Sequence, residues 1–197
     1  IRILVYPNIT YLKNLKKDSY IQAIKQQIST LNEIRDDLWF YLILPEPVED
    51  LDFKNVTQHF QKFPSYIPAM RVHFNTFEFY KNVHKKFDFD LVMSHLPEHT
   101  HQIKNMVFNK THHWPNIFGY CHWFDFKNTA TWEVSSFNQN ITGLLEYDRC
   151  YLNTEYQKQL VLTQMKDTFN KETIDKVDKT LKVQYLGVKE SDILEKT

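Results

Sequence analysis

Two side chains that can exchange protons, His122 and Asp125, follow a short apolar segment at residues 117–121. The segment reads Ile-Phe-Gly-Tyr-Cys and comes after a turn-forming Trp-Pro-Asn at 114–116, a pattern typical of a strand buried on both faces. In an open sheet of parallel strands, ligands bind just beyond the carboxyl ends of the strands. An imidazole there can act as a general base, and a nearby carboxylate can orient it and stabilise its charge. The pattern therefore predicts a catalytic pair.

Trp123 lies between these two residues, and its ring could line a cleft and stack on a sugar or a base. The alternative is that His122 and Asp125 are ordinary loop residues and that Trp123 packs the loop against the core. The two interpretations differ in whether these side chains face a cleft.

Three other predicted strands also end at residues that could line a cleft. Pro7 and Asn8 follow the first strand, His95 follows the fourth, and Asn153 follows the sixth. Because the carboxyl ends of parallel strands meet at one edge of a sheet, these residues are expected to line the same cleft. Asn153 and its neighbour Thr154 have an alternative role as caps of the helix that follows.

Histidines are dense at the start of one predicted helix, where His95, Glu98, His99 and His101 fall within seven residues. His95 and His99 are four residues apart, a spacing at which two imidazoles could share a metal ion. His101 lies on another face of such a helix, and no Asp or Cys stands nearby. We interpret the group as partly exposed helix histidines and expect no metal site.

Apolar runs of strand length alternate with amphipathic segments along the whole chain, which predicts βαβ units with right-handed crossovers. Ser19 with Gln22, and Thr154 with Gln157, fit capping boxes that open two of the helices. Strands are expected at 2–6, 38–44, 55–60, 89–94, 117–121, 149–152 and 182–186. Helices are expected at 19–35, 74–86, 97–109, 137–147, 154–168 and 171–180. The predicted fold is α/β: a Rossmann-like, doubly wound, mainly parallel sheet of about seven strands with helices on both faces.

The turn after the first strand, residues 6–11, contains no glycine. Dinucleotide-binding and P-loop motifs need glycines there so that the backbone can approach phosphates. We therefore expect neither NAD, FAD nor a P-loop nucleotide, and no cofactor of another kind.

The formal net charge of the 197 residues is +0, so no overall field attracts nucleic acid or an anionic membrane. Lys13, Lys16 and Lys17 follow the first strand, and phosphate contact is the alternative to their being an ordinary solvated face. No apolar segment is long enough to span a bilayer and no secretory leader is visible, so a cytoplasmic location is expected. Cys121 and Cys150 fall in predicted strands and are expected to be buried thiols.

Several segments, taken in order, resemble the N-terminal domain of a GT-B glycosyltransferase of the family 4 type. They are the opening strand 2–6, the strand 89–95 that runs Phe-Asp-Leu-Val-Met-Ser-His, the strand end at 120–125 that runs Tyr-Cys-His-Trp-Phe-Asp, the strand–helix unit 147–158, and the closing segment 183–188 with Gly187. The stretch 120–125 is also similar to the corresponding part of bacteriophage DNA glucosyltransferases. One departure is that Pro7 and Asn8 stand where many members of the family carry glycines.

This resemblance implies a hexosyltransferase-like enzyme that transfers a sugar from a nucleotide-sugar to an acceptor hydroxyl without a metal. Residues 1–188 would form the acceptor-side domain, and 189–197 would begin a linker to a missing C-terminal domain that holds the donor. The chain opens on a strand without Met and stops soon after one, which fits a fragment that is inactive alone. The implied catalytic residues are His122 and Asp125, and the implied acceptor- or donor-binding residues are Pro7, Asn8, His95, Trp123, Asn153 and Gly187.

Two other classes of function remain open on the sequence. One is a doubly wound module that binds a small ligand or a protein partner without chemistry. The other is a nucleic-acid-associated domain whose rim lysines contact backbone phosphates, which the neutral net charge disfavours.

Overall fold

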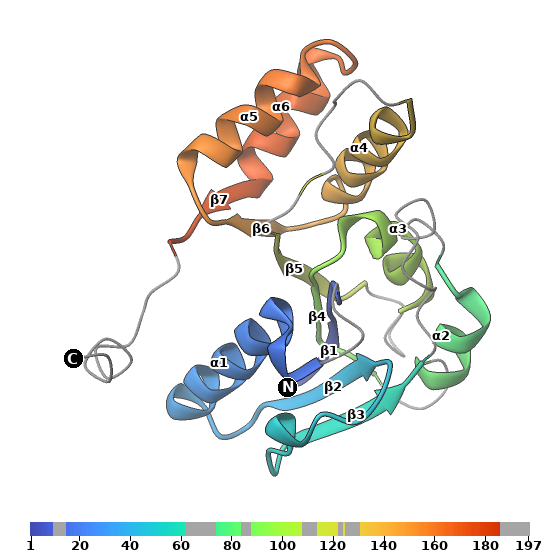
Figure 1. Ribbon diagram of the computed structural model, residues 1–197, viewed down its shortest axis with the longest axis vertical. Coiled ribbons are helices and arrows are strands. Elements are labelled where there is room, and N and C mark those ends of the chain that lie inside the picture. Colours follow the sequence, from blue (N-terminus) through green and yellow to red (C-terminus); the bar gives the residue numbers. More distant parts are fainter. Residues whose placement is uncertain are drawn as a thin grey trace.

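The computed structural model describes residues 1–9, 15–61, 74–83, 88–107, 114–121, 124 and 131–185, with only the backbone of 131–135. Seven strands form one parallel sheet in the order β3-β2-β1-β4-β5-β6-β7 (Figure 1). The strands are β1 Arg2–Tyr6, β2 Trp39–Leu44, β3 Val56–Phe60, β4 Leu91–Ser94, β5 Asn116–Tyr120, β6 Arg149–Leu152 and β7 Leu181–Val183. The predicted Rossmann-like, doubly wound fold is confirmed, and every pairing between neighbouring strands is parallel.

Six α-helices and two short 3-10 helices are present in the described part of the chain. They are η1 Leu15–Lys17, α1 Ser19–Ile34, η2 Glu49–Leu51, α2 Thr76–Val83, α3 Pro97–Met106, α4 Thr131–Leu144, α5 Glu155–Met165 and α6 Lys171–Thr180. None of the described helices has the length and apolar character needed to cross a membrane.

One predicted helix start and one predicted helix cap are wrong. Helix α4 begins at Thr131 rather than at residue 137, because polar residues that resemble a loop are helical here. Helix α1 is capped by Asp18 and not by Ser19: the Asp18 carboxylate accepts hydrogen bonds from the backbone amides of Tyr20 and Ile21 at 2.9 and 3.3 Å. A carboxylate at this position also interacts favourably with the positive end of the helix dipole.

Each face of the sheet has its own core, because successive side chains of a strand point to opposite faces. On one face, side chains of β1 and β2 pack against α1; they include Ile3, Val5, Phe40, Leu42, Ile24 and Ile28. On the other face, side chains of β1, β4, β5 and β6 pack against α2 to α6; they include Leu4, Val92, Ile117, Cys150, Phe79, Ile103, Phe137, Val161 and Val177.

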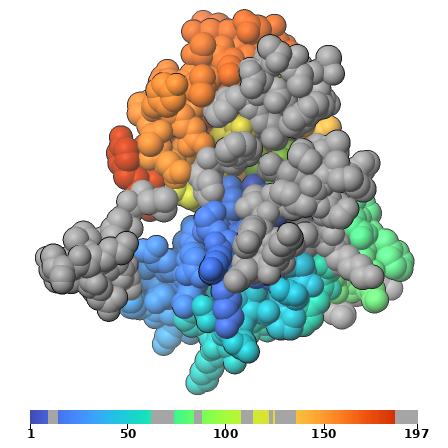
Figure 2. All heavy atoms as spheres, in the orientation of Figure 1, coloured from blue at the N-terminus to red at the C-terminus, as the bar shows by residue number. Residues whose placement is uncertain are grey.

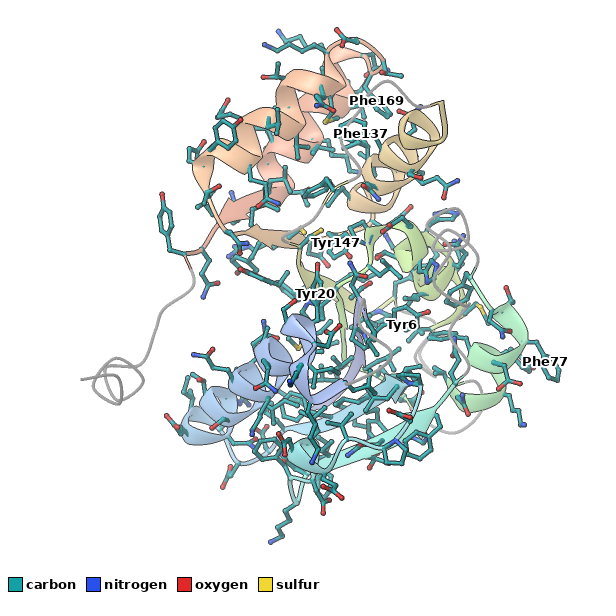
Figure 3. The ribbon with its side chains drawn as sticks, viewed as in Figure 1. Tyr6, Tyr20, Phe77, Phe137, Tyr147 and Phe169 are labelled. Atoms are coloured by element: carbon teal, nitrogen blue, oxygen red, sulfur yellow. The ribbon has the colours of Figure 1, made fainter. Side chains whose placement is uncertain are left out.

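The upper part of the second core lies among the last three helices. Phe137 of α4 is fully buried, and Phe169 packs against the same core between α4 and the pair formed by α5 and α6 (Figure 3). In the space-filling view, this helix pair (orange) and the strands β2 and β3 (blue to cyan) form opposite ends of the molecule (Figure 2).

The two cores do not cover the sheet equally. In the described part of the chain, α1 is the one α-helix that contributes to the first core, and it packs on β1 and β2. On the same face, Met93 of β4, Phe118 of β5 and Tyr151 of β6 are only partly buried. The face of β5 that carries Phe118 is therefore less covered than its apolar sequence predicts.

Candidate functional site

The sheet has a topological switch point between β1 and β4. The chain leaves β1 toward β2 and β3 on one side, and it returns to the other side of β1 to form β4. In doubly wound sheets, ligands bind in the crevice at the carboxyl ends of the two strands where the connections diverge. Pro7 and Asn8 follow β1 and His95 follows β4, and the His95 amide donates a hydrogen bond to the Tyr6 carbonyl at 2.8 Å. Three predicted site residues thus stand on neighbouring strand ends.

Aromatic residues link Asn8 to His95. The Asn8 amide donates to the Tyr20 hydroxyl at 3.3 Å, and the Tyr20 ring lies 5.9 Å from the His95 ring. The His95 Nδ1 atom is 3.0 Å from the Tyr120 carbonyl oxygen and 3.3 Å from the Tyr120 amide nitrogen. The Tyr120 amide donates to Nδ1, whereas the contact with the carbonyl needs a proton on Nδ1, so the two contacts belong to different tautomers of the imidazole.

These side chains are well protected from solvent. His95 and Tyr20 are each 1% exposed, and Asn8 is 3% exposed. Burial, with a smaller effect of the neighbouring Cys121, raises the pKa of Tyr120 to about 12. Tyr120 therefore stays neutral at physiological pH, and the imidazole of His95 is held in one orientation by the backbone of β5.

His99 belongs to a separate buried group on the other face of the sheet. Its Nδ1 atom is 3.0 Å from the Tyr6 hydroxyl, which also hydrogen-bonds Gln61. Burial raises the pKa of Tyr6 well above its ordinary value, and the nearby carboxyl group of Glu98 raises it further. The Phe74 ring lies 5.4 Å from the His99 ring and closes the group.

The expectation of partly exposed helix histidines is wrong for His95 and His99, which are each 1% exposed. Helix α3 begins only at Pro97, so His95 precedes it, and the two rings have different partners. His101 alone matches the expectation: its side chain is 55% exposed and lies 2.9 Å from the Glu146 carboxylate. Within the described residues, no group of three or more His, Cys, Asp and Glu side chains is arranged to hold a metal ion.

A third buried network holds β4 against α3. The Tyr147 hydroxyl donates to the Ser94 carbonyl at 2.9 Å, and the Thr100 hydroxyl lies 2.8 Å from both the Tyr147 and the Ser94 hydroxyl oxygens. Burial raises the pKa of Tyr147 well above its ordinary value. Because Ser94 directly precedes His95, this network fixes the strand end that presents the imidazole.

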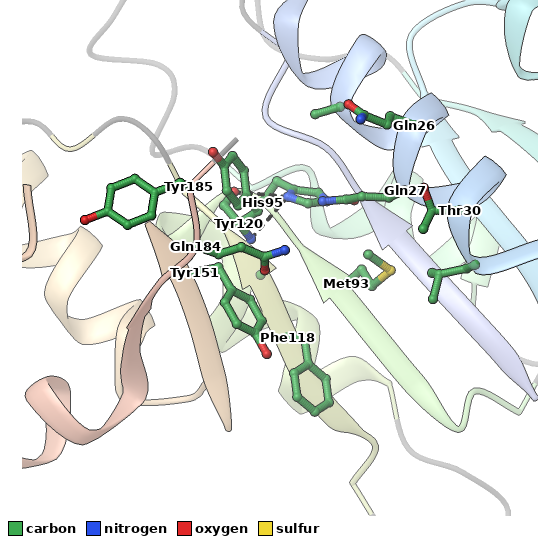
Figure 4. A pocket seen from close by; sticks show the side chains of 13 residues that line it. Gln26, Gln27, Thr30, Met93, His95, Phe118, Tyr120, Tyr151, Gln184 and Tyr185 are labelled. Atoms are coloured by element: carbon green, nitrogen blue, oxygen red, sulfur yellow. Dashed lines mark hydrogen bonds between the residues drawn. The ribbon is translucent and has the colours of Figure 1, made fainter. Parts of the chain in front are cut away.

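A groove of about 380 Å³ opens beside His95, between α1 and the partly covered face of β4, β5 and β6 (Figure 4). We call it the aromatic groove. Its volume lies within the usual range of ligand pockets, roughly 300–1,000 Å³. Aromatic rings and uncharged polar groups predominate in its lining, which includes Phe118, Tyr120, Tyr151, Tyr185, His95, Gln26, Gln27, Thr30 and Gln184.

Sequence reasoning missed most of this groove. It found His95 from its place at a strand end, but not Gln27, Phe118 or Tyr151. The available signal was the order of the connections: with right-handed crossovers, the helix between β1 and β2 lies on one face and those after β4 lie on the other. The face of the sheet that carries α1 is then left without a covering helix over β4, β5 and β6 in the described part of the chain.

Asn153 stands apart from His95, because it follows β6 and β5 lies between β6 and β4. Its Oδ1 atom is buried and has no hydrogen-bond partner among the described residues. The capping prediction is confirmed for its neighbour, since the Thr154 hydroxyl accepts a hydrogen bond from the Gln157 amide at 3.1 Å.

The predicted site residues His122, Trp123, Asp125 and Gly187 lie outside the described residues. Cys121, which immediately precedes His122, is buried at the end of β5. The structure places both cysteines in the interior, as expected, without a disulfide between them.

Together, the strand order and the polar strand ends define the class of this chain: a doubly wound α/β domain with a groove beside its switch point. Comparisons with models of protein families and with curated proteins found no match to the sequence.

Proposed function

We propose that this chain is the acceptor-side domain of a glycosyltransferase that moves a sugar from a nucleotide-sugar to an acceptor hydroxyl. The observation that carries the proposal is the convergence of Asn8, Tyr20 and His95 at the β1–β4 switch point, beside a groove large enough for a sugar. The strands that end there are the ones whose sequences resemble the glycosyltransferase family.

In the proposed reaction, the acceptor hydroxyl gives its proton to the imidazole of His122, and Asp125 orients that imidazole. The acceptor oxygen forms a bond to the anomeric carbon of the sugar, and the bond from that carbon to the nucleotide diphosphate breaks. His95, held by the backbone of Tyr120 at 3.0 Å, acts as a positioning residue at the neighbouring strand end.

The diphosphate of the donor needs a second domain under this proposal. The turn after β1 has Pro7 and Asn8 in place of a glycine-rich phosphate loop, and no cationic side chain is among the described residues that line the aromatic groove. Residues 1–188 would therefore bind the acceptor, and 189–197 would begin the linker to a donor-binding domain.

A binding module without catalysis is the second candidate. It is favoured by the burial of His95, which leaves 1% of that residue exposed and makes it resemble a structural histidine. A nucleic-acid-associated function gains less support, because the Lys16 ammonium at the rim is already paired with Glu49 at 2.9 Å.

The proposal is tested by screening the longest polypeptide that contains this chain for hydrolysis of a panel of nucleotide-sugars, with residues 1–197 alone as the comparison. We expect hydrolysis by the longer protein and none by the isolated chain. Calorimetry should find nucleotide-sugar binding to residues 1–197 in the millimolar range, where binding is worth only about 4 kcal/mol. Micromolar binding by this chain alone would contradict the assignment of the donor to another domain.

A further inference from the structure

We propose that the aromatic groove binds a neutral saccharide. The inference rests on the proposed function, because it names the chemical class of the acceptor, but it is argued from the lining of the groove itself.

The floor of the groove is formed by aromatic rings on adjacent strands. Tyr151 of β6 is paired in register with Tyr120 of β5, and Phe118 lies two residues before Tyr120 on the same face. Side chains directly opposite each other on one face of a sheet lie in contact distance. Phe118 and Tyr151 are each only partly buried, so ring surface is accessible from the groove. The C–H groups on one face of a pyranose ring pack well against the negative face of an aromatic ring.

The opposite wall offers uncharged hydrogen-bonding groups. Gln26, Gln27 and Thr30 project from α1 over the sheet, and Gln27 reaches toward His95 (Figure 4). An amide side chain both donates and accepts hydrogen bonds, which suits hydroxyl groups that do the same. The Gln27 Oε1 atom is buried and has no hydrogen-bond partner among the described residues, so its side chain would gain a hydrogen bond by turning toward a ligand hydroxyl in the groove.

The absence of charged side chains among the described lining residues favours a neutral ligand over an anionic one. No Lys, Arg, Asp or Glu is among the described residues that line the groove. A phosphate or carboxylate placed here would lose water without gaining a counter-ion, which is unfavourable. A nucleic acid would need cations along its backbone. A purely apolar ligand, in turn, would leave the amides and hydroxyls of the lining unpaired.

The experiment is a ligand-observed NMR titration of residues 1–197 with four neutral disaccharides (maltose, cellobiose, lactose and chitobiose) and with glucose 6-phosphate as the anionic probe. We expect at least one disaccharide to bind in the millimolar range, and glucose 6-phosphate to bind at least tenfold more weakly. Tyr151→Ala should weaken disaccharide binding at least tenfold. The matched control Tyr156→Ala, at a position 76% exposed on α5 and outside the groove, should leave it unchanged.

A variant that adds a positive charge tests whether the uncharged lining is what disfavours anionic ligands. The position chosen is exposed, so the substitution should not disturb folding. Gln26 is exposed on α1, so Gln26→Lys should fold normally and should raise the affinity for glucose 6-phosphate at least tenfold. The inference is overturned if none of the four disaccharides binds, if Tyr151→Ala and Gln26→Lys both leave every affinity unchanged, or if the wild-type chain prefers the phosphate ester. If the groove instead binds an apolar protein segment, none of the four disaccharides will bind.

Failure of this inference and failure of the proposed function give different results. Nucleotide-sugar turnover by the longer protein without disaccharide binding to the groove would refute the inference alone. Disaccharide binding that Tyr151→Ala abolishes, in a protein that turns over no nucleotide-sugar, would refute the transferase and keep the saccharide site.

Discussion

Gly143 should be one of the positions in this domain where a single methyl group is most harmful. It lies in α4 against Pro97, the first residue of α3, and a Cβ atom built on Gly143 would overlap the carbonyl group of Pro97. Replacing glycine by alanine in a helix interior is otherwise favourable by about 1 kcal/mol, which is an upper limit for Gly143 because it is the next-to-last residue of α4. Forcing an extra methyl group into a packed core costs roughly 1–3 kcal/mol, and occasionally more.

The steric cost should exceed the gain in helix propensity, because the opposing atoms belong to the backbone of α3 and cannot rotate away. We expect Gly143→Ala to lower the free energy of unfolding by about 2 kcal/mol, near the upper end of the steric range after the propensity gain is subtracted. With an m-value of about 2 kcal/mol/M, the urea midpoint should fall by about 1 M.

The matched control is Thr142→Ala, at the exposed neighbouring position of α4, where the change should stay within about 0.5 kcal/mol. Urea unfolding followed by circular dichroism measures both variants. If Gly143→Ala unfolds at the same or a higher urea concentration than the wild type, the close approach of α3 and α4 is wrong.

Two further predictions concern buried and paired groups. Tyr147→Phe removes the hydroxyl that donates to the Ser94 carbonyl, and it should lower the free energy of unfolding by about 1–3 kcal/mol. The control Tyr156→Phe, at an exposed site, should leave that free energy almost unchanged. Equal urea midpoints for the two variants would count against the hydrogen-bond network around Tyr147. Burial raises the pKa of Glu146, but the hydrogen bonds from Lys104 and His101 outweigh it and hold that pKa below its ordinary value. A carboxyl group with a lowered folded-state pKa adds stability above its unfolded pKa of about 4.3, and that stability is lost as the pH falls through the lower folded value. Melting temperatures between pH 6 and 3 should therefore fall less steeply for Glu146→Gln than for the wild type, and parallel curves would show that the pairing adds no stability.

Most of the fold could be predicted from the sequence because its strands are short apolar runs between polar or proline-containing turns. Strands β1 and β6 were predicted to the residue, and the parallel order follows from the alternation with helices. The errors lie at element ends, where local signals compete. Ser19 fits a capping box, but the Asp18 carboxylate one residue earlier makes the actual cap. A polar segment before residue 137 resembles a loop, but it is helical from Thr131.

Only the site residues that directly follow a strand could be predicted from the sequence. His95 and Asn8 follow apolar strands, and the rule that ligands bind at carboxyl ends was enough to find them. Tyr151 and Gln27 gain their role from the part of the sheet that α1 leaves uncovered, which depends on strand order and not on local pattern. Phe118 shows the same limit, since an apolar run does not reveal whether one of its faces lines a groove.

The central proposal is that the carboxyl edge of this sheet carries out sugar transfer. The measurement that tests it most directly is nucleotide release from a nucleotide-sugar by the longest polypeptide that contains this chain and by its His122→Ala variant. A positioned general base contributes about 10²–10⁴ in rate. We predict that the variant releases nucleotide slower by this factor at an unchanged melting temperature, while the control His101→Ala, at an exposed position, keeps the wild-type rate. A wild-type protein that releases no nucleotide, or a His122→Ala variant that melts earlier while its folded fraction keeps full activity, would contradict the account.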